Sequence, residues 1–373
     1  MQKNWLSLGL MSGTSGDGVD ASIIRTNGID NYEPIKDKYF EYETDIFKGI
    51  HSIKEKIDKI DHLEQHKEEI NNLERKITIF HAKIISDFKK IEDNFLVGFH
   101  GQTIYHNSKE RVSKQLGDAK LLYQLTRKKI IYNFRKKDID NGGEGAPLTP
   151  IFHQLIAKQK NISLPVCFLN IGGISNITLV KKNFGASGLF SKDIGPGNCL
   201  IDLWIRKNSN KKFDQNGKIS LIGKTNQIIL EQAQELYANR ANKKKKSFDT
   251  SDFDVSFARG LSLEDGAATL SDFTAGVISE GLYLAVKKSE NKCKEILLCG
   301  GGRKNKTLVE NIKKNLPSKI NLSLIDKLKI NGDFIESQAF AFLAIRSYLK
   351  IPISFPNTTG CKKATLGGEL INN

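Results

Sequence analysis

A glycine-rich loop between two apolar segments near the N-terminus is the feature that most constrains the fold. The run WLSLGLM ends abruptly in SGTSGDG, and the alternating segment DASIIRT follows within two residues. This order predicts a strand, a tight turn and a second strand. Glycine lets a backbone approach an anion closely, and a neighbouring carboxylate can hold a hydrated magnesium ion. The motif alone fits a phosphate-binding hairpin or an ordinary glycine-rich turn. It is not a Walker loop, because it lacks the closing Gly-Lys-Ser/Thr and the following helix.

The same pattern returns twice, which favours the phosphate-binding interpretation. The segment Val166–Val180, VCFLNIGGISNITLV, is again an apolar strand, a glycine turn and a second β-rich strand. The segment Glu295–Asn305, EILLCGGGRKN, is an apolar strand that runs into glycines and then into the helix-like TLVENIKKNL. Strands that end in glycine loops and alternate with helices are typical of α/β proteins, in which ligands bind at strand ends. The sequence therefore predicts two related α/β halves facing a common cleft.

Size and composition fit a soluble globular protein. A chain of 373 residues fits roughly two to three domains. No apolar run approaches the roughly 20 residues needed to span a bilayer, and the N-terminal segment is better explained as a first core strand than as a signal peptide. We therefore expect a cytoplasmic protein that is not bound to a membrane. The 5 cysteines form no CxxC pair, so we expect reduced thiols without a disulfide or zinc site.

The positive net charge raises the question of nucleic-acid binding. The chain has 57 Lys and Arg against 42 Asp and Glu, a net charge of +15. The lysines are scattered through an Asn- and Ile-rich chain, and the one dense run is Lys243–Lys246. No aromatic side chains interleave with that run, as a base-stacking surface would require. We expect a solvated loop there, and no nucleic-acid partner.

Apolar spacing and glycine–proline breaks organise the rest of the chain. Residues 44–92 predict one or two amphipathic helices, and NGGEGAPLTP at Asn141–Pro150 is the strongest break. The other expected elements are a buried strand at Asn94–His100, a helix at Leu116–Lys128, a strand in KIIYNF, and long helices at Asp265–Lys287 and Ile335–Leu349.

At this point the motifs resemble a known family, the 1,6-anhydro-N-acetylmuramic acid kinases. The blocks that match in family order are MSGTSGDGVD (11–20), FHGQTIYH (99–106), NFRKKDID with GGEGAPLTPIFH (from 133), LNIGGISNIT (169–178), DIGPGN (193–198), CGGGRKN (299–305), ESQAFAFLA (336–344) and FPNTTG (355–360). The family belongs to the actin, sugar kinase and Hsp70-like superfamily. The resemblance implies a two-lobed fold of duplicated RNase H-like halves with an interlobe cleft, and a homodimer. We expect lobe I at 1–139, completed by 355–373, and lobe II at 140–354.

The resemblance implies an enzyme that opens the 1,6-anhydro bridge of its sugar with water and phosphorylates O6 with ATP, in peptidoglycan recycling. It gives Asp193 the role of general base toward that water, and it places Glu336 at an acidic position facing the sugar. On residues alone, Asp193 could instead cap a turn or the helix near Leu200, and Glu336 could serve the helix dipole. Arg135 can pair with the lactyl carboxylate of a muramic sugar.

Three more residues are expected to bind the sugar. His100 and Gln102 come after a buried strand, where polar groups need partners, so we expect them to line the sugar side of the site. Asp17 is the third expected sugar-binding residue. The alternative for His100 is a hydrogen-bonded core histidine.

Nucleotide binding is assigned to the glycine motifs. The first hairpin would cradle the β- and γ-phosphates, with Asp17 or Asp20 holding magnesium through water. The residues assigned to ATP are Gly13, Thr14, Ser15, Gly16, Asp17, Gly18, Val19 and Asp20, then Gly172, Gly173, Ser175 and Asn176 as a second phosphate clamp, and Gly300, Gly301, Gly302 and Asn305 at the adenosine end.

Two positions depart from the family pattern. Gly16 stands where the family usually has Met or Leu, which should loosen the loop. Ile194 replaces the Thr of Asp-Thr-Gly-Pro-Gly-Asn and removes a hydroxyl beside Asp193. Two rival functions remain open: a kinase of another 1,6-anhydro sugar, which would gain nothing from Arg135, and an ATP-binding regulator or nucleic-acid-associated module, which would need no base at Asp193.

Overall fold

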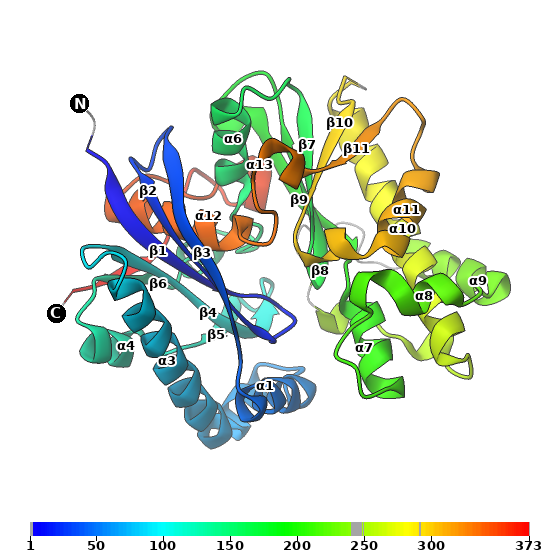
Figure 1. Ribbon diagram of the computed structural model, residues 1–373, viewed down its shortest axis with the longest axis horizontal. Coiled ribbons are helices and arrows are strands. Elements are labelled where there is room, and N and C mark those ends of the chain that lie inside the picture. Colours follow the sequence, from blue (N-terminus) through cyan, green and yellow to red (C-terminus); the bar gives the residue numbers. More distant parts are fainter. Residues whose placement is uncertain (1–2, 240–247, 249, 291, 373) are drawn as a thin grey trace. The chain divides into compact units, whose positions relative to one another are not determined.

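The computed structural model describes residues 3–239, 248, 250–290 and 292–372, and the chain divides into two compact units (Figure 1). Unit 1 comprises residues 1–162, 185–189 and 333–373, and unit 2 comprises residues 163–184 and 190–332. The run Lys243–Lys246 lies outside the described residues. Within the described ranges, no helix has both the length and the apolar character needed to cross a membrane.

Unit 1 is built on one mixed sheet. Its strands are β1 (Trp5–Ser12), β2 (Gly18–Thr26), β3 (Tyr32–Glu41), β4 (Leu96–Asn107), β5 (Val112–Leu116), β6 (Ile130–Tyr132) and β12 (Glu369–Ile371). The order across the sheet is β3-β2-β1-β4-β6-β12, with β5 paired to β4. The first three strands form an antiparallel meander, and β4 runs parallel to β1 on its other side.

Helices cover both faces of this sheet. They are α1 (Thr44–Lys56), α2 (Asp61–Gln65), α3 (Lys67–Lys89), α4 (Ala119–Thr126), α5 (Lys136–Asp140), α6 (Pro150–Gln159), α12 (Ile335–Tyr348) and α13 (Pro356–Thr359). Buried side chains of α1, α3 and α4 form one core with Leu8 and Leu10 of β1, while α12 packs on the opposite face (Figure 1). Alternate residues of a strand face opposite sides, so β1 serves both layers.

Unit 2 repeats the strand order of unit 1. Its strands are β7 (Val166–Ile171), β8 (Ile174–Val180), β9 (Leu189–Pro196), β10 (Glu295–Cys299) and β11 (Asn321–Leu324). The order is β9-β8-β7-β10-β11, with β7 antiparallel to β8 and parallel to β10. A central strand with a hairpin partner on one side and a parallel strand on the other therefore occurs in both units. This confirms the predicted α/β class with related halves.

The helices of unit 2 gather around one long helix. They are α7 (Cys199–Asn208), α8 (Lys218–Ile222), α9 (Gln227–Ala238), α10 (Leu263–Lys288) and α11 (Lys306–Asn315). The central helix, α10, contacts the other four and β8, and its small and apolar residues are buried along almost its whole length. The predicted helices at 265–287 and 335–349 are confirmed as α10 and α12.

The structure places three segments differently from the expected lobe boundaries. Residues 140–162, 185–189 and 333–354, expected in lobe II, belong to unit 1. The reason is tertiary: α12 packs on β1, β2 and β4, and Gln159 of α6 exchanges two hydrogen bonds with the backbone of Tyr32 (3.1 and 2.7 Å). The strand expected to end at His100 also continues to Asn107 in β4, because β5 pairs with its second half.

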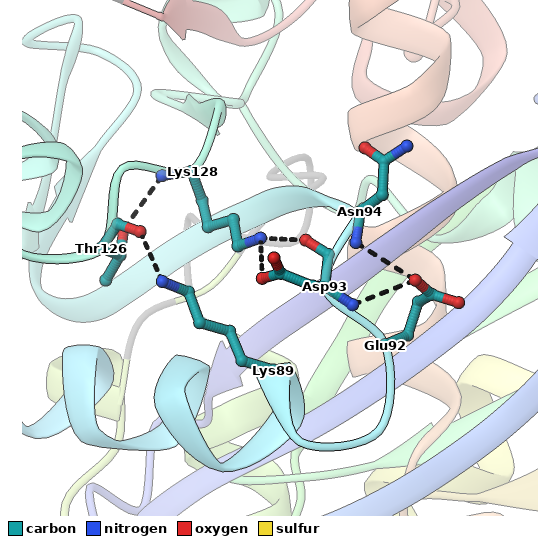
Figure 2. Close-up of polar contacts among 6 residues, drawn as sticks. All are labelled: Lys89, Glu92, Asp93, Asn94, Thr126 and Lys128. Carbon is teal, nitrogen blue, oxygen red and sulfur yellow. Dashed lines mark hydrogen bonds and ion pairs between the residues drawn. The ribbon is translucent and has the colours of Figure 1, made fainter.

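Lysine side chains hold the loop between α3 and β4 in place (Figure 2). Lys128 donates to the carboxylate of Asp93 at 2.7 Å and also to the Asp93 carbonyl. Lys89, at the end of α3, donates to the carbonyl of Thr126 at 2.9 Å. The carboxylate of Glu92 accepts the backbone N–H of Asp93 at 3.0 Å. These contacts connect the loop that precedes β4 with the loop that precedes β6. Strands β4 and β6 run parallel to each other.

Helix α12 lies directly against the backbone of the central strands. A Cβ atom at Gly9 of β1 would stand 1.9 Å from the carbonyl oxygen of Ser337, and one at Gly98 of β4 would stand 2.5 Å from that of Phe340. No side chain fits at either position, because the obstacle is backbone. The two glycines lie opposite each other in the parallel β1–β4 register. Together they leave a stretch of the sheet without side chains, and the backbone of α12 packs directly against it.

We predict that Gly9→Ala lowers the free energy of unfolding by at least about 2 kcal/mol, because α12 must move away from the sheet. Urea denaturation measures the change. Gly49→Ala in α1 is the control, since its Cβ would meet only the flexible side chain of Leu73, whose nearest methyl carbon is at 3.0 Å, and alanine favours a helix. An equal loss of unfolding free energy in the two variants would contradict the direct packing of α12 on the backbone at Gly9.

Candidate active site

The first glycine motif forms the predicted hairpin. Strands β1 and β2 pair up to Met11 and Asp20. At the tip, the N–H of Gly16 donates to the carbonyl of Gly13 at 3.2 Å, and Gly16 adopts a left-handed φ of 65°. The hydroxyl of Ser15 donates to the carboxylate of Asp17 at 2.6 Å. The turn is therefore closed by its own backbone and holds Asp17 in a fixed orientation.

Three side chains from other elements support this tip. The amide of Gln102 in β4 donates to the carbonyl of Gly13 at 3.0 Å, and the ammonium of Lys54 in α1 donates to the carbonyl of Thr14 at 2.8 Å. Ile50 of α1 fills the space beside Gly16, where a Cβ would meet its methyl carbon at 2.8 Å. We expected Gln102 on the sugar side, and the structure places its side chain at the tip of the first hairpin. At Gly16, where we expected a looser loop, the adjoining space is occupied by Ile50.

The second half of the first glycine motif, Gly18 and Val19, packs in the interior of unit 1. A Cβ at Gly18 would stand 2.4 Å from the carbonyl oxygen of Phe40, and the side chain of Val19 is fully buried. Val19 can therefore contact a nucleotide only through its backbone. Burial raises the pKa of Tyr39, and the carboxylates of Asp17, Glu41 and Asp20 raise it further.

The donor set suits a metal held through water and phosphate. Among the described residues, no three His, Cys, Asp or Glu side chains gather closely enough to form a protein-only metal site. Magnesium usually retains several waters and binds through one or two carboxylates plus substrate phosphates. The residues present at Asp17 and Asp20 fit that mode.

The structure brings His100 and Arg135 together. The Nδ1–H of His100 donates to the carbonyl of Gly101 at 2.7 Å, so its Nε2 is the acceptor for two N–H groups of Arg135, at 2.9 and 3.2 Å. Burial, and then the charge of Arg135, hold the pKa of His100 well below its usual range. A third N–H of Arg135 donates to the carbonyl of Gly145 at 2.7 Å. A neutral histidine therefore fixes the orientation of the guanidinium.

Asp138 organises the loop behind Arg135, and our sequence reasoning missed it. Its buried carboxylate accepts the N–H of Gly145 at 2.7 Å and the hydroxyls of Ser354 and Thr359 at 2.5 and 2.6 Å. These donors come from two segments far apart in the sequence, the loop at Gly145 and residues 354–359. Glu336 lies in the first turn of α12 and is half-buried, at the end of the helix seated on β1 and β4.

In unit 2, Asp193 lies near the end of β9. Its side chain is 5% exposed, and one carboxylate oxygen accepts the N–H of Phe248 at 2.9 Å. The neighbouring Ile194 packs on α10, where a Cβ at Gly281 would stand 2.5 Å from the Cβ of Ile194. Strand and helix thus hold the carboxylate in a buried, hydrogen-bonded position.

The turn after Asp193 is tied to the second hairpin. The N–H groups of Gly197 and Asn198 donate to the carbonyls of Gly173 and Gly172, both at 2.8 Å. In the described part of the chain, Ser175 Oγ and Asn176 Oδ1 are buried without a hydrogen-bond partner. A hydroxyl can donate to phosphate, and an amide oxygen can accept from metal-bound water. The pair fits the expected phosphate clamp.

The third glycine motif also reaches this hairpin. A Cβ at Gly300 would stand 2.4 Å from the side-chain oxygen of Asn170, whereas one at Gly301 would meet nothing within 4 Å. Gly301 therefore leaves open space for a ligand. The side chain of Asn305 accepts the N–H of Leu308 at 3.0 Å as the N-cap of α11, so its local role is structural.

A pair of variants tests the packing of the first hairpin. Gly16→Ala should cost about 1–2 kcal/mol of unfolding free energy from the left-handed φ, plus the overlap with Ile50. In the double variant with Ile50→Ala, the total cost should fall below the sum of the single costs by about 1 kcal/mol. Urea denaturation of the single and double variants gives this coupling.

Gly13→Ala is the control for this cycle, since its Cβ would meet only Ser15 Oγ, at 3.6 Å. Strict additivity of the Gly16 and Ile50 costs would show that the two residues do not pack on each other.

Comparison with known proteins identifies the family. Residues 5–372 match the family model described as anhydro-N-acetylmuramic acid kinase. The protein of that name from Pelagibacter ubique (strain HTCC1062) is 55% identical over 377 residues, with 100% of both chains covered. Those from Agrobacterium fabrum and Zymomonas mobilis subsp. mobilis are each 34% identical over 98% of this chain, and 98% and 99% of the relatives are covered.

One solved structure, the activator of the 2-hydroxyisocaproyl-CoA dehydratase from Clostridium difficile with bound ADPNP, is 12% identical with a TM-score of 0.42 and covers 92% of this chain and 96% of that one. A likeness this weak adds nothing on fold or function. The match along nearly the whole chain and the full-length relatives show that this kinase belongs to the anhydro-N-acetylmuramic acid kinase family.

Proposed function

We propose that this kinase uses ATP and water to convert 1,6-anhydro-N-acetylmuramic acid into N-acetylmuramic acid 6-phosphate and ADP. The observation that carries the proposal is the buried, hydrogen-bonded carboxylate of Asp193 beside a glycine turn that is tied to a second glycine hairpin. A carboxylate in that position can serve as a general base, whereas a binding module or regulator has no need of one.

The reaction that we propose needs a base but no general acid. Asp193 takes a proton from the water that attacks the anomeric carbon, as the base of an inverting glycosidase does. The bond from that carbon to O6 breaks, and its electron pair leaves with O6. The O6 oxygen then forms a bond to the γ-phosphorus, while the bond from that phosphorus to the bridging oxygen of ADP breaks. The N–H of Phe248 keeps Asp193 oriented throughout.

The glycine hairpins would hold the nucleotide. The tip N–H groups of the first hairpin suit phosphate oxygens. In the second hairpin, the Ser175 hydroxyl suits a phosphate oxygen and the Asn176 amide oxygen suits a metal-bound water. Asp17 and Asp20 would hold magnesium through water; when bound, the ion neutralises charge on the phosphates. Catalysis of phosphoryl transfer rests mostly on such positioning and charge neutralisation.

Arg135 favours a muramic sugar over a 1,6-anhydro sugar without an acid group. A guanidinium oriented by His100 and Gly145 matches a carboxylate, and the lactyl group of the muramic sugar supplies one. Glu336 would hold a sugar hydroxyl. The product fits a role in recycling cell-wall sugars, and we extend the proposal to a cytoplasmic homodimer.

Asp193→Asn tests the base. The variant keeps an oxygen that can accept the Phe248 N–H, so we expect it to bind both substrates and turn over at least roughly a hundredfold more slowly. The measurement is ADP release with the anhydro sugar, in oxygen-18 water, where the wild type should place the label at the anomeric carbon. Asp254→Asn, an exposed carboxylate of the same unit, is the control. Near-native turnover of Asp193→Asn would refute the assignment.

Arg135→Ala should raise the KM for the anhydro sugar by about tenfold or more, with a smaller effect on kcat, because the lactyl carboxylate loses a charged partner. Steady-state kinetics with varied sugar measures both constants. Lys136→Ala is the matched control, since Lys136 is exposed and pairs with Asp140 on the same helix. An unchanged KM in Arg135→Ala would favour a sugar without the acid group.

A further inference from the structure

We propose that Lys54 and Gln102 are positioning residues that turn two consecutive peptide units of the first hairpin, so that the N–H groups of Thr14 and Ser15 point at the nucleotide phosphate. This role rests on the proposed function and specifies how its phosphate site is built. It comes from two contacts, Lys54 Nζ to the Thr14 carbonyl at 2.8 Å and Gln102 Nε2 to the Gly13 carbonyl at 3.0 Å.

Peptide planarity converts each of these contacts into an orientation. In a trans peptide the C=O and the next N–H point in opposite directions. By binding the carbonyl of Gly13, Gln102 directs the N–H of Thr14 away from itself. Lys54 does the same for the N–H of Ser15 through the Thr14 carbonyl. Among the described residues, these two N–H groups donate to no protein acceptor, so they suit an external anion.

The fold places each positioning residue for this task. Gln102 lies beside Ser12 in the parallel β1–β4 ladder, at the point where β1 enters the tip. Lys54 lies one helical turn after Ile50, whose methyl carbon packs at Gly16. Helix α1 is held by its buried residues Ile46, Ile50 and Ile53. Both contacts to the tip therefore come from rigid elements.

Lys54 also contributes through its charge. A cation bound to the carbonyl polarises the peptide and strengthens its N–H as a donor. The carboxylate of Asp17, two residues beyond Ser15, would otherwise disfavour an anion at this tip. Lys54 offsets that charge from behind the hairpin without occupying the phosphate site itself.

The experiment compares nucleotides that differ in phosphate number. Isothermal titration with ADP, AMP and the non-hydrolysable analogue AMPPNP is performed on the full chain and on Lys54→Met and Gln102→Leu. We expect each variant to bind AMPPNP and ADP about tenfold more weakly, with AMP affinity changed less than about twofold. The KM for the anhydro sugar should not change. Lys54→Arg, which keeps a cationic donor, should restore most of the lost affinity.

Lys56→Met provides the matched control, because Lys56 lies on the same helix and pairs with exposed Glu69 at 2.8 Å. Wild-type affinities in both Lys54→Met and Gln102→Leu would overturn the inference, as would an equal loss for AMP, which would indicate a general distortion. Thermal denaturation confirms that each variant is folded, and Gln102→Leu carries the test alone if Lys54→Met is not. A wild-type protein that binds none of the nucleotides would instead overturn the proposed function.

Discussion

The direct contact of α12 with the backbone of β1 and β4 is the constraint on which unit 1 depends. Only glycine at positions 9 and 98 lets the helix carbonyls approach the strands so closely. The hydroxyl of Ser337 on the same helix also lies 2.6 Å from that of Ser22 on β2. The helix therefore spans three strands and fixes their relative positions. The register of β1 and β4 follows, and with it the place of Gln102 beside the hairpin tip.

Glycines in and beside the family motifs include two kinds, which differ in the space around them. At Gly9, Gly98 and Gly197 a Cβ would overlap a backbone oxygen within 2.5 Å, so these glycines allow chain segments to pack closely. At Gly13 and Gly301 a Cβ would meet no atom closer than 3.6 Å. No protein atom at these two positions requires the absence of a side chain. The open space at glycines of this second kind is therefore better explained by the binding of a ligand.

The sequence predicted what local pattern controls. Alternating apolar residues around glycine turns predicted both hairpins, and apolar residues at helical spacing predicted α10 and α12. Contacts between residues far apart in the chain could not be predicted from the sequence. Nothing in the sequence distinguishes Lys54 from the exposed Lys56 two residues later, because only the packing of α1 brings one of them to Thr14. Asp138 was missed for the same reason, since its partners Ser354 and Thr359 lie far along the chain.

The two departures from the family motif are each accommodated by a neighbour. At Gly16 the loop loses a side chain, and Ile50 of α1 occupies the adjoining space. At Ile194 the chain exchanges a hydroxyl for a branched apolar side chain, and α10 presents the bare backbone of Gly281 to receive it. An apolar contact next to Asp193 holds β9 on α10 without adding a polar group that would compete for the carboxylate. The orientation of Asp193 then depends on packing and on the Phe248 N–H, so the loss of the hydroxyl leaves the position of the proposed base defined.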